Sequence, residues 1–208
     1  MIGATLHGLV LAFGLIIPLG AQNVFVFNQG AVQSRFLRVL PVIITASICD
    51  TLLIVAAVLG VSFVILTVSW LQFVLFGIGI FFLLYMGLSV WRSHGGSPSH
   101  REEEVSPKKQ IAFAASVSLL NPHAILDTVG VIGTNSLSYT GTEKMAFTLA
   151  CIFVSWAWFF GLAIAGRIVG NIDRTGTIVG KINKLSALII WGVALYLIYQ
   201  LFWGANTG

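Results

Sequence analysis

The chain has 208 residues, of which 57% are hydrophobic and only 9% are charged. Soluble domains carry about 25% charged residues, so this composition excludes a soluble globular protein and predicts one surrounded mainly by lipid. The formal net charge of +4 does not indicate nucleic-acid binding, because the basic residues fall in short loops rather than on one face. No basic segment precedes the first apolar run and no cleavage site follows it, so we expect no removable signal peptide.

Six apolar segments are long enough to cross a bilayer as helices, which takes roughly 20 residues each. In chain order these predicted spans cover residues 3–28, 40–66, 70–91, 111–133, 145–167 and 184–203. Lipid cannot satisfy open backbone groups, so we expect an all-α membrane protein. A stretch rich in Gly, Ser, Pro and charge divides the spans into two groups of three. We therefore predict a first three-helix repeat at 1–91, a linker at 92–110 and a second repeat at 111–208.

The first span is interrupted by the sequence PLGAQN at residues 18–23. Pro18 removes a helical hydrogen bond and clashes with the preceding turn, and Gly20 adds backbone freedom. We predict two half-helices joined by an unwound hinge near 18–21. The N–H groups that begin the second half suit a carboxylate, and Gln22 and Asn23 place two amides beside them. The alternative is a simple proline kink whose amides are satisfied by neighbouring helices.

Two acidic residues fall inside the predicted spans, and the other five of the seven fall in loops. Asp50 lies about ten residues into the second span, near the bilayer centre, and Asp127 lies in the fourth span. A charge at that depth costs at least about 2.5–3.5 kcal/mol, and no Lys or Arg is predicted there. We expect the balancing cation to come from outside the chain, as a substrate ammonium or guanidinium, a proton or sodium. The alternative is a pair of structural aspartates bonded to Thr51, Thr128 or Asn121.

A proline followed five residues later by a polar residue occurs in the first span of each half of the chain. Pro18 and Pro122 lie 104 residues apart, half the chain length, and Asn23 and Asp127 follow them at the same distance. Three spans per half would insert the second half inverted, as in many secondary transporters, whose sites lie at midplane where broken helices meet. We therefore predict two inverted three-helix repeats, with broken helices at spans one and four. His123, directly after Pro122, could relay protons or cap a carbonyl group freed by the proline.

Small and sulfur-containing residues add two expectations. Cys49 and Cys151 lie in separate apolar segments without the spacing of metal ligands, so we expect no metal site and no cofactor. Gly166 and Gly170 form a GxxxG motif in the fifth span, which predicts close helix packing. The motif leaves open whether that packing lies within one chain or between two chains of a homodimer.

The loop charges predict an orientation. Ten of the eleven Lys and Arg residues fall in the loops after spans one, three and five, whereas Lys144 alone falls on the opposite side. Loops rich in Lys and Arg stay in the cytoplasm. Both termini are therefore predicted to face outward.

Several motifs resemble those of the bacterial lysine/arginine exporter family, over essentially the whole chain. They are GAQN in span one, ICDTLLIVAAVLG in span two, LLYMG in span three and SLLNPHAILDTVGVIG in span four. Leu19 and Ala21 depart from the PGPN sequence of the related homoserine/threonine exporter branch, which favours the basic-amino-acid branch. The resemblance implies efflux of basic L-amino acids across a bacterial inner membrane. The family's aspartates in spans two and four would correspond to Asp50 and Asp127.

These observations together predict a secondary active exporter that works by alternating access. The substrate carboxylate would dock at the two helix breaks, beside Gln22, Asn23 and Asn121. Asp50 and Asp127 would hold the α-ammonium and the cationic side chain of the substrate.

Net export of a cation opposes an inside-negative potential, so a coupling ion is required. We favour the proton, which Asp50, Asp127 and His123 can carry, with sodium as the alternative. The main rival is an exporter or channel for another small cation or a metal ion, built on a ring of carboxylates. An enzyme is not expected, because no nucleophile–base pair or HExxH motif is present.

Overall fold

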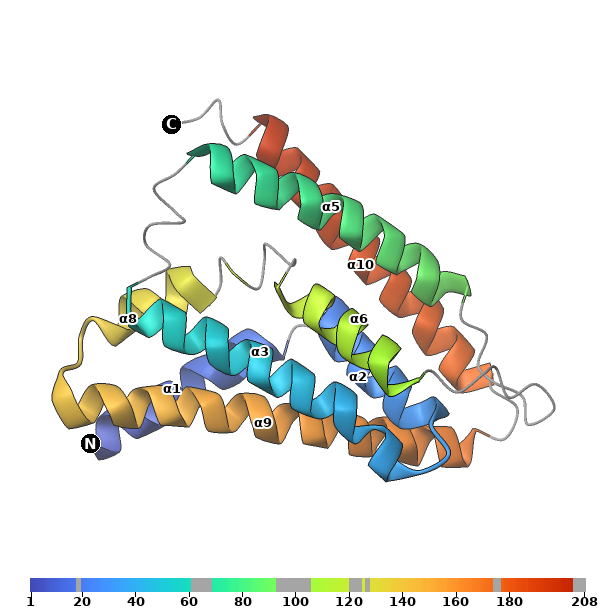
Figure 1. Cartoon of the computed structure of the whole chain (residues 1–208), viewed down its shortest axis with the longest axis horizontal. Helices are drawn as coiled ribbons and strands as arrows, with labels where there is room; N and C mark the ends of the chain where they lie inside the picture. The colour runs from blue at the N-terminus through green and yellow to red at the C-terminus, as the bar shows by residue number, and fades with distance from the viewer. Residues whose placement is uncertain are drawn as a thin grey trace.

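The computed structural model describes residues 1–17, 20–60, 69–92, 106–119, 125, 128–173 and 177–203. Within these ranges every regular element is a helix, which confirms the all-α prediction (Figure 1). The long helices are α1 (Ile2–Ile16), α2 (Ala21–Val32), α3 (Leu40–Val58), α5 (Ser69–Arg92), α6 (Pro107–Leu119), α9 (Gly141–Ile172) and α10 (Thr177–Trp203). Three short helices join them: η1 (Phe36–Arg38), the π-helix η2 (Thr128–Gly133) and α8 (Thr134–Ser136).

The first predicted span consists of two helices. α1 and α2 are bent by 80° relative to each other. Pro18 and Leu19 lie outside the described residues, but Gly20 is the N-cap residue of α2, with an extended backbone at φ −77° and ψ 172°. Two helices with a sharp bend between them are thus observed where two half-helices were predicted, while the hinge at Pro18 and a single broken span stay predictions. The first residues of α2, Ala21 to Val24, are buried.

The fourth predicted span contains α6, η2 and α8. α6 ends at Leu119, and η2 begins at Thr128. Asn121, Pro122, His123 and Asp127 lie outside the described residues, so the second helix break stays a prediction.

Two described helices, α3 and α9, are each long and apolar enough to cross a membrane, and α1 with α2 would make a third if the bent pair is one span. α9 has 32 residues and is about 48 Å long, well beyond the predicted span at 145–167. α10 likewise begins seven residues before its predicted span, so Lys181 and Lys184 lie on the helix and not in a loop. The difference arises because the apolar run marks the bilayer, whereas a helix continues into the polar interface.

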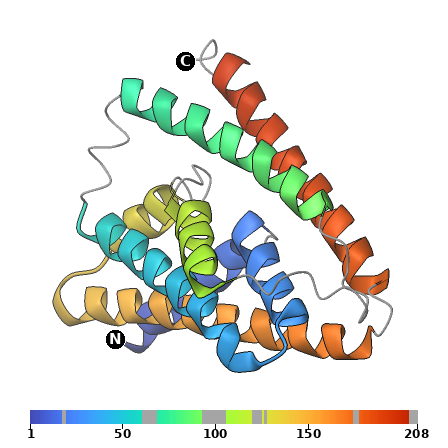
Figure 2. The ribbon, with the colours of Figure 1, turned by 45° about the vertical axis from the view of Figure 1, so that its right-hand side comes forward.

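The helices of the two halves pack on each other. α1 and α2 lie along α9, while α6 and η2 lie along α3; α3 also packs on α9, and α5 on α10. In both views, α5 and α10 lie side by side, above the group that contains α1, α3 and α9 (Figures 1 and 2). Shifting the sequence by half its length carries α1 onto α6 and α2 onto η2 and α8. The same shift carries α3 onto α9 and α5 onto α10. The contact of α1 with α9 therefore corresponds to the contact of α6 with α3, and the α3–α9 and α5–α10 pairs each correspond to themselves.

Small residues let α2 and α9 approach closely. A Cβ atom built on Gly166 would overlap the carbonyl oxygen of Phe27, and one on Gly170 would overlap that of Ala31. In the reverse direction, a Cβ on Gly30 would overlap the carbonyl oxygen of Ala163. The close packing predicted from the GxxxG motif is confirmed, and its partner is α2 of the same chain.

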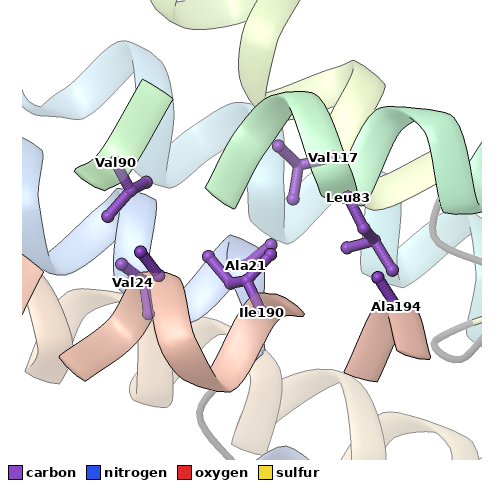
Figure 3. Packing of buried hydrophobic residues seen from close by; sticks show 8 residues of the cluster. Ala21, Val24, Leu83, Val90, Val117, Ile190 and Ala194 are labelled. Atoms are coloured by element: carbon purple, nitrogen blue, oxygen red, sulfur yellow. The ribbon is translucent and has the colours of Figure 1, made fainter. Parts of the chain in front are cut away.

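The α5–α10 pair packs on α2 and α6 through an apolar cluster, here called the α5–α10 cluster (Figure 3). α2 contributes the first two residues, α6 contributes Val117, and α5 and α10 contribute the rest. Its members are Ala21, Val24, Leu83, Val90, Val117, Ala187, Ile190 and Ala194. The start of α2 is thereby held against the α5–α10 pair.

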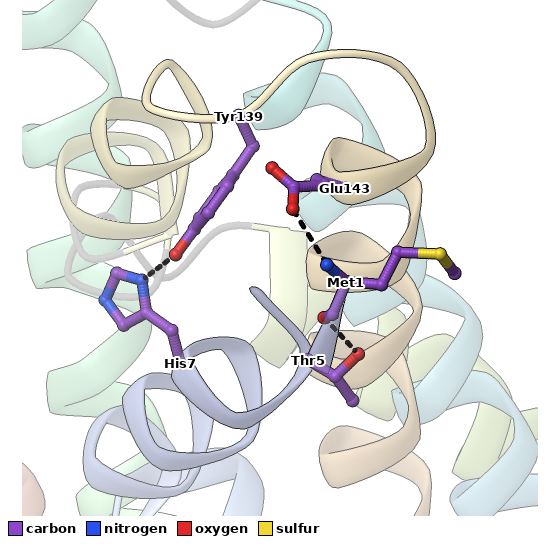
Figure 4. Close-up of polar contacts among 5 residues, drawn as sticks. All are labelled: Met1, Thr5, His7, Tyr139 and Glu143. Atoms are coloured by element: carbon purple, nitrogen blue, oxygen red, sulfur yellow. Dashed lines mark hydrogen bonds and ion pairs between the residues drawn. The ribbon is translucent and has the colours of Figure 1, made fainter. Parts of the chain in front are cut away.

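Polar contacts at the two ends of α9 group the chain's loops. At one end, the Met1 ammonium pairs with Glu143 at 2.8 Å, and His7 Nδ1 shares a 2.8 Å hydrogen bond with the Tyr139 hydroxyl (Figure 4). At the other end, Arg167 donates to the backbone oxygens of the loop after α2, at Gln33 and Ser34. The N-terminus and the loop before α9 therefore share one end of the molecule.

Candidate functional site

Asp50 lies in the middle of α3, where three helices meet. Gln22 of α2 donates its amide Nε2 to Asp50 Oδ1 at 3.1 Å. Ser155 of α9 donates its hydroxyl to Asp50 Oδ2 at 2.5 Å. The structure thus brings together two of the residues predicted for the site, Asp50 and Gln22, and adds Ser155.

The break between α1 and α2 positions the amides at this site. Gln22 follows the N-cap residue of α2 by two positions, so the break places the first turn of a helix beside Asp50. Asn23 Nδ2 donates to the carbonyl oxygen of Ile16 at 2.8 Å, which satisfies one of the acceptors that α1 leaves open at its end. Both amide side chains are buried. Gln22 therefore reaches across to Asp50, while Asn23 ties the two half-helices together.

A second hydrogen bond between α3 and α9 lies next to the first. Trp156 Nε1 donates to Thr51 Oγ1 at 3.1 Å. The Thr51 hydroxyl donates to the backbone oxygen of Ser47 at 2.7 Å, and not to Asp50. Asp50 is therefore held by side chains from other helices.

Ser155 and Trp156 were missed by the sequence analysis. The signal that could have found them is the half-chain offset between Pro18 and Pro122, which carries Asp50 to Val154, directly before Ser155. Each hydrogen-bonded pair between α3 and α9 spans 105 residues of sequence. Inspection of the residues on either side of that equivalent position would have included this serine.

Five of the predicted site residues lie outside the described part of the chain: Pro18, Asn121, Pro122, His123 and Asp127. The nearest described element is η2, which begins one residue after Asp127 and packs on α3. Whether Asp127 joins Asp50 in one site stays a prediction.

The donors around Asp50 are neutral. Among the described residues, the one ion pair joins Met1 and Glu143 at the end of α9, and no Lys or Arg contacts Asp50. The described part of the chain also contains no group of three His, Cys, Asp or Glu side chains that could hold a metal ion. An ionised Asp50 would therefore need a cation that these residues do not supply.

The family is decided by the match between the chain and the LysE type translocator family, which covers residues 13–201. The chain belongs to the LysE family. This is a family of membrane transporters rather than of enzymes, which agrees with the long apolar helices α3 and α9.

Curated relatives of this LysE-family chain match it almost end to end. YisU of Bacillus subtilis (strain 168), whose name proposes an amino-acid transporter, is 54% identical over 199 residues, covering 96% of this chain and 90% of YisU. The arginine exporter protein ArgO of Enterobacter sp. (strain 638) is 33% identical over 201 residues, covering 95% of this chain and 94% of ArgO. ArgO of Escherichia coli (strain K12) is 32% identical over 195 residues, covering 92% and 91%. No solved structure gives a significant match.

Proposed function

We propose that this LysE-family protein exports basic amino acids, with arginine as the first candidate, by proton-coupled alternating access. The observation that carries the proposal is Asp50, whose carboxylate receives only neutral donors from the described helices. The relatives named as arginine exporters support an amino acid with a cationic side chain as the cargo. Lysine is the second candidate.

The geometry at Asp50 suits a guanidinium or ammonium group. A carboxylate offers about four acceptor positions, of which Gln22 and Ser155 take two. The remaining positions can accept a cation through charge-assisted hydrogen bonds, which are roughly twice as strong as neutral ones. The first N–H groups of α2 lack helical partners and provide a place for the substrate carboxylate. Asp127 and Asn121 would complete the site from the second helix break.

The contacts of the α5–α10 pair suggest how access alternates. Leu83 and Val90 of α5 correspond, by the half-chain offset, to Ala187 and Ala194 of α10, and all four belong to the α5–α10 cluster. The pair is thus symmetric in itself, but it packs on α2 and not comparably on the counterparts of α2, which are η2 and α8. In the opposite state of an inverted repeat, α5 and α10 would move from α2 toward η2 and α8.

Membrane orientation and energy coupling follow from charge. We place the end of the molecule that contains Arg167 and the loop after α2 in the cytoplasm of a bacterial inner membrane, with both termini outside. Export of a cation against an inside-negative potential costs about 2.3 kcal/mol per charge per 100 mV. Inward movement of a proton bound to Asp50, after the cargo has left, would offset this cost.

The test is arginine and lysine counterflow in proteoliposomes, with Asp50→Asn compared with wild type. The matched control is Glu143→Gln, which neutralises an exposed acid outside the site. We expect saturable exchange in wild type and in the control, and its loss in Asp50→Asn. Exchange that survives in Asp50→Asn would contradict the role of Asp50.

Counterflow also separates the proposal from the rival channel, because a channel gives no saturable counterflow. If wild type fails to exchange either amino acid, the cargo is another cation, and flux of metal cations is the next measurement.

A further inference from the structure

The hydrogen bond from Ser155 to Asp50 suggests a role for the serine that goes beyond binding. Ser155 lies in the middle of α9, its side chain is buried, and its hydroxyl is 2.5 Å from Asp50 Oδ2. It is the only side chain of α9 for which the described residues show a bond to this carboxylate. This hydrogen bond between two packed helices holds the Asp50 carboxylate against α9.

The two partners of Asp50 differ in what they can do. The Gln22 Nε2 group can donate a hydrogen bond but cannot accept one, whereas a serine hydroxyl does both by rotating its hydrogen. When Asp50 is ionised, both partners can donate to it over the distances seen here. When Asp50 is protonated, its own O–H needs an acceptor, and the Ser155 oxygen is already within reach. Ser155 can therefore satisfy Asp50 in both protonation states.

Among the residues that the structure describes, the other polar side chains near Asp50 are not hydrogen-bonded to its carboxylate. On α3 itself, the Cys49 thiol is adjacent in sequence, and the Thr51 hydroxyl is committed to the Ser47 backbone oxygen. The Ser47 hydroxyl is buried one turn before Asp50 but makes no hydrogen bond to it. On α9, the Cys151 thiol points to the Gly8 backbone oxygen of α1. On α6, the Ser118 hydroxyl donates to its own helix.

Charged groups do not compensate Asp50 either. Within the described ranges, α2, α6, α9 and η2 direct no Lys, Arg, Asp or Glu side chain at Asp50, and Arg167 of α9 bonds to the loop after α2. The protonation of Asp50 is therefore linked most directly to Ser155.

We propose that Ser155 is a positioning residue that allows Asp50 to exchange the bound cation for a proton. This inference rests on the proposed function, in which Asp50 binds the cation. After the substrate cation leaves on the outer side, a proton from the outer solution forms an O–H bond with the Asp50 carboxylate, and the Ser155 oxygen accepts that O–H. On the cytoplasmic side the O–H bond breaks, the proton passes to water, and the next cation binds the carboxylate.

The physical reason is the cost of a buried donor without a partner. An O–H group left unsatisfied in an apolar interior costs about 1–3 kcal/mol. Removal of the hydroxyl would place that cost on the proton-loaded return of the carrier. The substrate-loaded form, in which Asp50 is a carboxylate held by the cation and by Gln22, would be affected much less.

The experiment compares Ser155→Ala and Ser155→Thr in proteoliposomes by two assays. The first assay is arginine–arginine exchange, in which Asp50 stays loaded with cation. The second assay is net arginine efflux driven by an imposed proton gradient, which requires the proton-loaded return. We expect Ser155→Ala to lower net efflux at least tenfold while exchange and its KM stay within about twofold of wild type. We expect Ser155→Thr, which keeps a hydroxyl, to restore net efflux.

A matched control lies on the same helix. Thr148 donates its hydroxyl to the backbone oxygen of Lys144, so Thr148→Ala removes a hydroxyl from α9 without touching Asp50 and should leave both assays unchanged. Because the methyl group of threonine enters a tightly packed contact, Ser155→Cys provides a second variant. Cysteine has no branched methyl group and is a weaker hydrogen-bonding group than serine, and we expect net efflux between those of wild type and Ser155→Ala.

Several results would overturn the inference. Equal loss of exchange and net efflux in Ser155→Ala would assign Ser155 to binding or folding instead. Full net efflux in Ser155→Ala would remove any role for the hydroxyl in the proton step. Absence of exchange in wild type would overturn the proposed function itself, and this outcome is distinct because it does not depend on any serine variant.

Discussion

Asp50 of α3 and Ser155 of α9 share a hydrogen bond although they lie 105 residues apart in the sequence. The adjacent residues, Thr51 and Trp156, form a second bond with the same separation. α3 and α9 each follow the first span of their half, and each bond joins a residue to the neighbour of its equivalent in the other half, because the half-chain offset is 104 residues. In an inverted repeat, helices that cross at the pseudo-two-fold axis bring equivalent segments together, and a site near this axis is related in the same way to both membrane faces.

The bond from Gln22 to Asp50 leads to the first prediction. Gln22→Leu removes the amide that fixes Asp50 Oδ1 and leaves a residue of similar size in α2. A hydrogen bond to a charged group contributes about 1.5–3 kcal/mol, so a carboxylate without it is oriented less well. We expect the KM for arginine in counterflow to rise about tenfold or more, with a smaller effect on the maximal rate.

The matched control for this prediction is Gln29→Leu. Gln29 is a buried amide on the same helix, but its side-chain oxygen accepts from Gln33, away from Asp50. If both variants raise the KM equally, the effect comes from disturbing α2 and not from the bond to Asp50.

The contact between α2 and α9 gives the second prediction. A Cβ atom at Gly166 meets the backbone of Phe27, which cannot rotate away, whereas Gly161 of the same helix has nothing within 4 Å. We expect Gly166→Ala to lower the free energy of unfolding by about 1–3 kcal/mol through overpacking, and Gly161→Ala to leave it unchanged or slightly higher because alanine favours helices. Thermal unfolding of both variants in the same detergent measures the difference.

Equal melting temperatures for the two glycine variants would contradict this packing. A change of oligomeric state on size-exclusion chromatography, in place of a loss of stability, would point instead to a contact between chains.

Local chemistry explains what the sequence allowed us to predict. The helix break follows from Pro18 and Gly20, which act within a few residues, and GxxxG predicts close packing because small residues permit it in any context. Asp50 could be singled out because an acid is rare in an apolar helix, and rarity needs no knowledge of the neighbours. These properties belong to the residue and its immediate sequence.

Other features depend on contacts that arise only in the folded chain. A serine such as Ser155 is common in membrane helices, so its importance depends on which helix faces it. The predicted span 145–167 is shorter than α9 because hydropathy marks the membrane crossing, whereas the helix itself runs from Gly141 to Ile172. The partner of the GxxxG motif could not be known before α2 was placed.

The α5–α10 cluster gives the third prediction. Ala21 of α2 faces Ile190 of α10 in this cluster (Figure 3). If α10 leaves α2 during transport, a short bifunctional thiol reagent that joins Ala21→Cys to Ile190→Cys should stop net efflux, and cleavage of the linker should restore it. The measurement is arginine efflux before cross-linking, after it, and after reduction.

The control is a cross-link inside the α5–α10 pair, between Leu83→Cys and Ala194→Cys, which would move together. Both double variants are made with Cys49 and Cys151, the two free cysteines, replaced by alanine. Transport that continues through the α2–α10 cross-link would contradict the proposed motion, and inhibition by both cross-links would assign the movement to α5 against α10.

The choice of coupling ion is the fourth prediction, and it rests on the oxygens of Asp50. A sodium ion in a transporter is coordinated by several oxygens at once, including unwound backbone carbonyls. At Asp50 the described neighbours instead direct an amide N–H and a hydroxyl hydrogen at the carboxylate. A proton needs only one carboxylate oxygen and one acceptor, both of which are present. We therefore expect a protonophore to abolish net arginine efflux while sodium is equal on both sides of the membrane.

Arginine–arginine counterflow serves as the internal control for this measurement, since it moves no net proton and should continue in the presence of the protonophore. Net efflux that persists without a proton gradient would contradict proton coupling. If that efflux then stops when the sodium gradient is removed, the cation that replaces arginine on the return is sodium, and the oxygens that coordinate it must come from residues other than Gln22 and Ser155. A dependence on neither gradient would leave the cargo's own gradient as the driving force, and the protein would be a facilitator that cannot export arginine against the membrane potential.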